Sequence, residues 1–236
     1  TAKIFGVSIQ TLRRWDNANE LSPIRKSTTG NRYYIRDDID DYINNNKGKL
    51  LFKLAKSWVI NDFKTEFYPD FYCPDSSVFQ GRLSKLENEL GEMRELDKIY
   101  PLISAIAGEI GNNSFDHNLG KWSDIPGIFF THDLHSKKIV LADRGQGILK
   151  TLRKVKPELS TYQKALDIAF NEIISGRAPE YRGNGLKFVR NVVADNEISL
   201  VFYTGDAKLK IDKSRTNLNI KKSKVFIKGC LALIRF

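Results

Sequence analysis

The sequence has few of the residues that mark several large classes of protein. Its two cysteines, Cys73 and Cys230, lie far apart and match neither a metal-binding nor a redox motif. Because cysteine is so rare, a reducing cytoplasm is the expected location. The chain has no run of about 18 apolar residues, so we expect neither a membrane-spanning helix nor a membrane partner.

Histidine is scarce as well, with three residues in the whole chain. His132 and His135 fall at a predicted strand end and the turn after it, and the sequence offers no evident fourth ligand for a metal ion. Metal binding by histidine is therefore not expected.

Positive charge, in contrast, is abundant and unevenly distributed. The formal net charge is +10, and residues 206–236 hold nine Lys and Arg against two Asp and Glu. A strongly basic segment favours polyanionic partners, although a merely solvated basic hairpin is the alternative for this tail. With 236 residues the chain is long for one compact domain, so we expect two.

The first fifty residues carry the signals of a helix-turn-helix unit followed by a β-hairpin. Ser8 is a good N-cap for a helix over residues 9–17. The pair Gly30-Asn31 predicts a tight turn between two basic strands. A further helix is expected over residues 37–43, and residues 44–48 have the composition of a short polar linker.

The segments GVSIQTLRRWDNANELSPIR and GNRYYIRDDID resemble the MerR/excisionase type of winged helix-turn-helix domain, which we place at residues 1–46. The resemblance implies double-stranded DNA as a partner, and a homodimer as a candidate assembly. A helix in the major groove would contact bases or phosphates, and the wing would hold phosphates. The residues implied are Thr11, Arg13 and Arg14 on the helix and Arg25, Arg32 and Tyr33 on the wing. A domain that binds protein, or arginines that are only solvated, is the alternative.

Residues 47–97 are expected to form a linker and a helical connecting segment. From Ser76 to about Asp97 the sequence has a helical pattern with one apolar stripe. We expect this stripe to pack into the core, with a dimerising helix as the alternative. Its members are Phe79, Leu83, Leu86, Leu90 and Met93.

The most informative motif lies in the run GEIGNNSFDHN. Glu109, Asn113 and Asp116 have the spacing i, i+4, i+7, which places them on one face of a helix expected over residues 101–118. Taken alone, this pattern also fits an amphipathic helix with a polar exposed end.

Two glycine motifs follow. An Asp-x-Gly-x-Gly motif comes after two predicted strands, residues 128–131 and 138–142, and a Gly-x-Gly motif precedes a further helix. Glycine lets the backbone approach a ligand closely, and the free N–H groups at a helix N-terminus bind phosphate. The residues are Asp143, Gly145 and Gly147 in the first motif, with Gly183, Gly185 and the nearby Lys187 in the second.

A helix-borne acid and amide, then Asp-x-Gly-x-Gly, then Gly-x-Gly, in that order, resembles the ATP site of the GHKL superfamily, over residues 98–236. The resemblance implies ATP and Mg²⁺ as cofactors. It also implies a Bergerat α/β sandwich with a mixed sheet, so the whole chain would be of the α+β class. Residues 148–182 would form the lid over the nucleotide, with a helix at about residues 161–174.

The resemblance also implies roles for single residues. Asn113 would be the Mg²⁺ ligand, because Mg²⁺ prefers oxygen, and Glu109 would orient or deprotonate the attacking water. Asp116 matches the acid of gyrase-like members, and Asp143 would accept a hydrogen bond from the adenine amino group. The glycines Gly145 and Gly147 would approach the base, while Gly183, Gly185 and Lys187 would contact phosphates. Many members have Gly-Thr near the final strand, where this chain has Gly229-Cys230.

Together the two resemblances suggest a DNA-binding regulator that uses Mg-ATP as a switch or hydrolyses it slowly. A serine/threonine protein kinase of the anti-sigma-kinase type, which phosphorylates a partner protein encoded nearby, is the alternative. A gyrase-like or MutL-like machine is a third reading, but the chain leaves no room for their further domains. Autophosphorylation in the manner of histidine kinases is not expected, because no histidine precedes His117.

Overall fold

The computed structural model of the protein describes residues 1–2, 8–25, 31–60, 70–172, 184–213 and 218–236. It contains two compact units, Thr1–Leu54 and Ala55–Phe236. Helices and strands occur in both units, so the fold is of the α+β class, as expected.

The first unit has the elements expected of a winged helix-turn-helix. Helix α1 (Ile9–Asn17) begins at Ser8, whose hydroxyl accepts a hydrogen bond from Thr11 N at 3.1 Å. Strands β1 (Ile24–Arg25) and β2 (Arg32–Tyr33) pair antiparallel as the wing. The turn predicted at Gly30 lies outside the described residues. A small core is formed by Leu12, Trp15, Leu21, Ile39, Tyr42 and Leu50.

Helix α2 (Arg36–Ile60) corrects the expected short helix and polar linker, because it runs without interruption through residues 44–48. The asparagines there are weak helix formers, but no proline breaks the chain. The following residues, 49–60, are rich in Lys, Leu and Ala, which favour helix. Packing adds to this preference, since Ala55, Trp58 and Val59 are buried in the second unit.

The second unit is built on a five-stranded sheet of order β3–β4–β5–β7–β6. The sequence led us to expect a mixed sheet, but each of the four pairings between described residues is antiparallel. The reason is that β5 and β6, joined by a crossover of helices, point the same way but are separated by β7. The strands are β3 (Tyr72–Cys73), β4 (Ile128–Asp133), β5 (Lys138–Asp143), β6 (Ser199–Ile211) and β7 (Asn219–Arg235).

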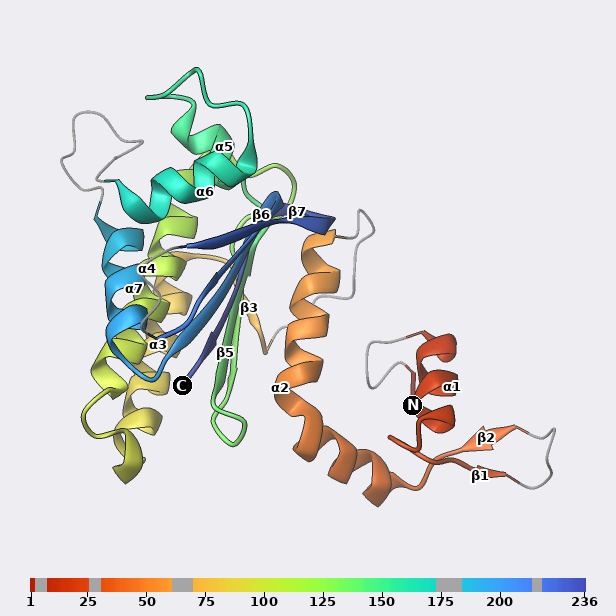
Figure 1. The fold of residues 1–236 in the computed structure, drawn as a ribbon. Helices are drawn as coiled ribbons and strands as arrows, with labels where there is room; N and C mark the ends of the chain where they lie inside the picture. Colours follow the sequence, from red (N-terminus) through yellow and green to blue (C-terminus); the bar gives the residue numbers. More distant parts are fainter. Residues whose placement is uncertain (3–7, 26–30, 61–69, 173–183, 214–217) are drawn as a thin grey trace. The chain divides into compact units, whose positions relative to one another are not determined.

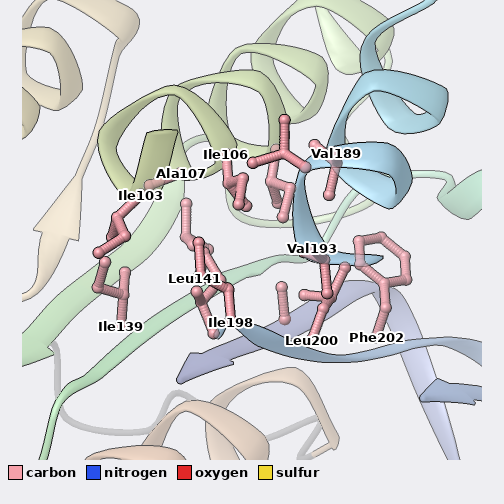
Figure 2. Close-up of a cluster of buried hydrophobic side chains, with 14 of the residues drawn as sticks. Ile103, Ile106, Ala107, Ile139, Leu141, Val189, Val193, Ile198, Leu200 and Phe202 are labelled. Atoms are coloured by element: carbon pink, nitrogen blue, oxygen red, sulfur yellow. The ribbon is translucent and has the colours of Figure 1, made fainter. Parts of the chain in front are cut away.

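Helices cover one face of this sheet (Figure 1). They are α3 (Ser76–Gly91), α4 (Tyr100–Asn118), α6 (Tyr162–Asn171) and α7 (Gly185–Asp195), with the short η1 (Arg94–Leu96) and α5 (Gly147–Leu152). Figure 2 shows side chains of α4 and α7 meeting those of β5 and β6 in the core. The labelled residues are Ile103, Ile106, Ala107, Val189, Val193, Ile139, Leu141, Ile198, Leu200 and Phe202.

The apolar stripe of α3 packs into this core, which confirms the first of the two interpretations. Phe79, Leu86 and Leu90 are fully buried, and Leu83 and Met93 pack against them from partly buried positions. Each such side chain stabilises the fold by roughly 2–3 kcal/mol through burial. The helix ends earlier than expected, at Gly91, and a 3₁₀ turn at residues 94–96 leads towards α4.

The last two strands, β6 and β7, are the longest of the described sheet, with 13 and 17 residues. A bulge between Thr204 and Ala207 maintains the pairing through Gly205, whose φ is +54°.

Candidate functional site

Helices α4 and α7 bring the first and third motifs together. Glu109 and Asn113 lie on α4, and Gly185 is the first residue of α7. A methyl group at Gly185 would overlap the Glu109 carboxylate and lie 3.4 Å from Asn113 Nδ2. The N-terminus of α7 therefore faces the acid and the amide of α4, and the positive end of its dipole favours negative charge there.

Asp116, Lys187 and Gly183 belong to the same two motifs. Asp116 is exposed on the next turn of α4, and Lys187 is half-buried on α7. Gly183 lies outside the described residues, so its contact with phosphate stays a prediction.

Asp143 ends β5 and is buried, with 1% of its surface exposed. Its carboxylate accepts hydrogen bonds from Gly145 N at 2.8 Å and from Ser114 Oγ at 2.9 Å. Burial raises the pKa of Asp143 to about 6, although these hydrogen bonds oppose the increase. Buried carboxylates with a raised pKa are common at functional sites.

Two residues of α4 that the sequence reasoning missed connect the first motif to the second. Ser114 binds Asp143, and Asn118 Oδ1 accepts a hydrogen bond from Gln146 N at 2.8 Å. A methyl group at Gly145 would overlap the Asn118 side chain, so the backbone and α4 approach closely here. Ser114 and Asn118 are four residues apart, and this helical spacing was the available signal.

A hydroxyl group lies directly across from Cys230, where the GHKL pattern has threonine. Thr204 of β6 is the Cα partner of Cys230. Its Oγ1 donates to Gly229 O at 2.9 Å and accepts from Ile148 N at 3.2 Å. The neighbouring strand thus places a hydroxyl opposite position 230, while burial and the nearby Asp143 raise the pKa of the Cys230 thiol.

Positive φ angles explain why two positions around the Asp143 carboxylate are glycine. Gly147 has φ +71° and Gly229 has φ +63°, both in the left-handed region that side chains disfavour. A methyl group at Gly229 would also overlap Asp143, and one at Gly147 would lie 2.9 Å from Thr204 Oγ1. Both positions therefore require glycine for conformation and for space.

Arg144, between Asp143 and Gly145, points away from this site and is 1% exposed. Its Nε donates to both carboxylate oxygens of Asp124 at 3.0 Å, and its guanidinium also binds Trp58 O. The guanidinium carbon lies 5.8 Å from the centre of the Trp58 ring, close enough for a cation–π contact. The second motif is thereby joined to the C-terminal end of α2.

Cationic side chains gather where α5 follows the second motif. Partial burial and the neighbouring charges of Lys121 and Lys150 lower the pKa of Lys154. Burial, together with Lys154, also lowers the pKa of His117 on α4. Their mutual repulsion makes this region favourable for an anion.

The first unit presents a second candidate surface on α1. Arg13 and Arg14 are exposed, whereas Leu12 and Trp15 on the opposite side are buried. A hollow of about 390 Å³ is lined by Ser8, Gln10, Thr11, Arg13, Arg14 and Asn17. The predicted recognition residues Thr11, Arg13 and Arg14 therefore share one surface.

The wing arginines are held more tightly than the sequence suggested. Arg25 and Arg32 are directly opposed on β1 and β2, and both bind the carboxylate of Asp16, with Arg32 Nε at 2.7 Å. The hydrogen bond from Arg32 contributes most to lowering the pKa of Asp16. Tyr33, in contrast, is half exposed. Phosphate contact by either arginine would have to compete with Asp16.

A comparison with known protein families matches part of the first unit. Residues 1–34 match the model of the family described as MerR family regulatory protein, which supports an N-terminal DNA-binding domain. The comparison with curated proteins found no match.

The described part of the chain holds no group of three or more His, Cys, Asp or Glu placed to bind a metal ion, and His132 Nε2 lies 2.7 Å from Glu89 Oε2. None of the helices described is long and apolar enough to cross a membrane.

Proposed function

We propose that the protein is a DNA-binding regulator whose second unit binds Mg-ATP in a GHKL-type site and uses it as a switch. The observation that carries the proposal is the meeting of three motifs, separated in sequence, around α4. Asp143 binds Ser114 of this helix, and Gly185 abuts Glu109 and Asn113. The match to the MerR family supports DNA as the target.

The chemistry of the residues fits this cofactor. Asp143 is an acceptor in a buried position, which suits the amino group of adenine, and Asn113 offers the oxygen that Mg²⁺ prefers. The N-terminus of α7 and the cations near Lys154 suit phosphates. Bound Mg-ATP would supply an activated γ-phosphate, and Glu109 would orient a water or accept its proton.

Arg144 offers a route from this site to the DNA-binding unit. It lies within the Asp-x-Gly-x-Gly motif and binds Trp58 of α2, and α2 begins in the first unit at Arg36. A change in backbone at residues 143–147 would therefore act on the end of a helix that continues into the DNA-binding unit. An element that both sites can bias is the physical requirement for such coupling.

Titration calorimetry of the full chain with Mg-ATP tests the site. Asn113→Ala and Asp143→Asn are each expected to weaken binding at least tenfold, because lost hydrogen bonds to charged groups are worth about 1.5–3 kcal/mol. Gly185→Ala should weaken binding as well, because its methyl group would overlap the Glu109 carboxylate. Asn112→Ala is the matched control, since Asn112 accepts a hydrogen bond from Gln80 of α3 at 2.7 Å. Unchanged binding by all three site variants would refute the assignment.

Turnover and DNA binding test the switch. Glu109→Gln is expected to retain Mg-ATP but to lose hydrolysis. Duplex affinity of the wild-type chain should change when Mg-ATP is added, and this change should be smaller for Arg144→Met. If ATP leaves duplex affinity unchanged and the γ-phosphate instead reaches a protein, the kinase alternative replaces the switch.

A further inference from the structure

Strands β6 and β7 continue beyond the five-stranded sheet as a two-stranded ribbon. β5 pairs only with residues 230–235 of β7, whereas residues 205–210 of β6 pair with residues 219–227 of β7. We call residues 205–211 and 219–228 the basic ribbon, because these residues include six lysines. These are Lys208, Lys210, Lys221, Lys222, Lys224 and Lys228.

One face of the basic ribbon belongs to the core of the unit. Ala207, Leu209 and Ile211 alternate along β6 and are at most 1% exposed. The residues between them, among them Lys208 and Lys210, therefore stand on the opposite face. The face that bears Lys208 and its cross-strand partner, the exposed Lys221, is available to a partner, so the ribbon would lie along a surface.

Two lysines on this face oppose each other directly. Lys208 and Lys221 are Cα partners in the antiparallel pair, which places their Cβ atoms about 5 Å apart. Like charges in this position destabilise a hairpin. Lys208 Nζ lies 5.4 Å from the centre of the Tyr203 ring, a distance that fits a cation–π contact.

The wing contains a comparable pair of opposed positive charges, which a carboxylate of the same unit neutralises. Arg25 and Arg32 are also directly opposed, and Asp16 binds both. On the ribbon, the carboxylates of Asp206 and Asp212 lie near Lys222 and Lys210 instead. Among the described residues, no carboxylate forms an ion pair with Lys208, Lys221 or Lys224. The uncompensated pair points to an external anion.

We propose that the basic ribbon is a second, sequence-independent DNA contact that binds the phosphate backbone of the duplex. The inference rests on the proposed function only in taking DNA as the target, and it does not depend on ATP. Lysine suits this task because it binds phosphate as a point charge without reading bases. Each lysine that neutralises a phosphate releases counterions, so the contact should appear in the salt dependence of binding.

Fluorescence anisotropy of the full chain with a duplex of random sequence, at several salt concentrations, measures this contact. For Lys208→Gln with Lys221→Gln, the slope of log affinity against log salt should fall by about 1.8, since each phosphate contact contributes about 0.9. At 0.1 M salt this corresponds to a loss of up to about 60-fold. Lys85→Gln with Lys98→Gln, two exposed lysines elsewhere on the unit, is the matched control and should bind as wild type.

Lys208→Glu separates DNA contact from a purely structural role. A glutamate opposite Lys221 forms a favourable cross-strand pair, so thermal stability should be retained or increased while duplex affinity falls. If the lysines merely protect the exposed strand edge from pairing with other chains, this variant would bind DNA as wild type, and that result would overturn the proposal.

Three further outcomes show which part of the reasoning has failed. If Arg13→Ala with Arg14→Ala abolishes duplex binding and the ribbon variants do not alter it, the ribbon proposal alone fails. If neither set of variants alters duplex binding, DNA binding by both surfaces fails. A ribbon variant that loses binding to vesicles of anionic lipid but not to duplex would assign the ribbon to a membrane surface and overturn the inference.

Discussion

The buried carboxyl of Asp143 is expected to lower the stability of the folded protein at neutral pH. The variant Asp143→Asn should restore part of the lost stability. The pKa of the buried carboxyl is about 6 in the folded chain, against an ordinary value of 3.8. A difference of about two pKa units corresponds to about 3 kcal/mol, because each unit is worth about 1.4 kcal/mol. This is an upper value, since the hydrogen bonds from Gly145 and Ser114 adapt when the charge changes.

The sign follows from proton binding. Between about pH 4 and pH 6 the folded protein holds a proton on Asp143 that the unfolded chain has released, so stability falls as pH rises through this window. The stabilising contribution is complete below about pH 4 and absent above about pH 6. In Asp143→Asn the amide does not titrate, so this part of the pH dependence should disappear.

Urea unfolding at pH values from 4 to 8 measures the effect. Tryptophan fluorescence reports on the second unit if Trp15, in the core of the first unit, is replaced by Phe, since Trp58 and Trp122 then remain. Relative to Asp143→Asn, the wild-type protein should lose up to about 3 kcal/mol of unfolding free energy between pH 4 and pH 7. Parallel stability curves for the two proteins would refute the reasoning.

The same titration predicts that the affinity for Mg-ATP depends on pH. If adenine binds the ionised carboxylate of Asp143, Mg-ATP affinity should decline by up to tenfold per pH unit below about pH 6. Asn113→Ala should shift the whole curve without moving this inflection. An inflection that persists in Asp143→Asn would assign it to another group.

Two further predictions concern ion pairs. Asp124→Ala removes the carboxylate that pairs with the buried Arg144 and should destabilise the second unit by about 3–5 kcal/mol in thermal or urea unfolding. A loss below about 1 kcal/mol would contradict the importance of this ion pair. Asp16→Ala releases Arg25 and Arg32, so affinity for random duplex should increase and become more sensitive to salt, as anisotropy can measure. Unchanged affinity would show that the wing arginines do not reach phosphate.

Local patterns predicted much of what the structure contains. Ser8 marks the start of α1, as its N-cap signal predicted. The spacing of Glu109 and Asn113 placed them correctly on a helix, and the strand before Asp143 was expected at its observed position. These features succeed because caps and periodicity act over a few residues, within one turn or one strand.

Contacts between distant segments were not accessible in the same way. The partners Asp16 and Arg32 are 16 residues apart, Ser114 and Asp143 are 29 apart, and Arg144 and Trp58 are 86 apart. The length of α2 was missed for a related reason, since buried residues at its end outweigh the weak helix preference of the asparagines. Such outcomes depend on which surfaces meet, and no short window of sequence contains that information.

The sequence by itself determined the order of the motifs, the chemistry of their side chains and the concentration of lysine near the C-terminus. Only the tertiary structure decided that Gly185 abuts Glu109, that the wing arginines share Asp16, and that Lys208 opposes Lys221. The physical reason is that charge and hydrogen bonding act through space. The same lysine or aspartate is neutralised, buried or available to a ligand according to the strands and helices that pack beside it.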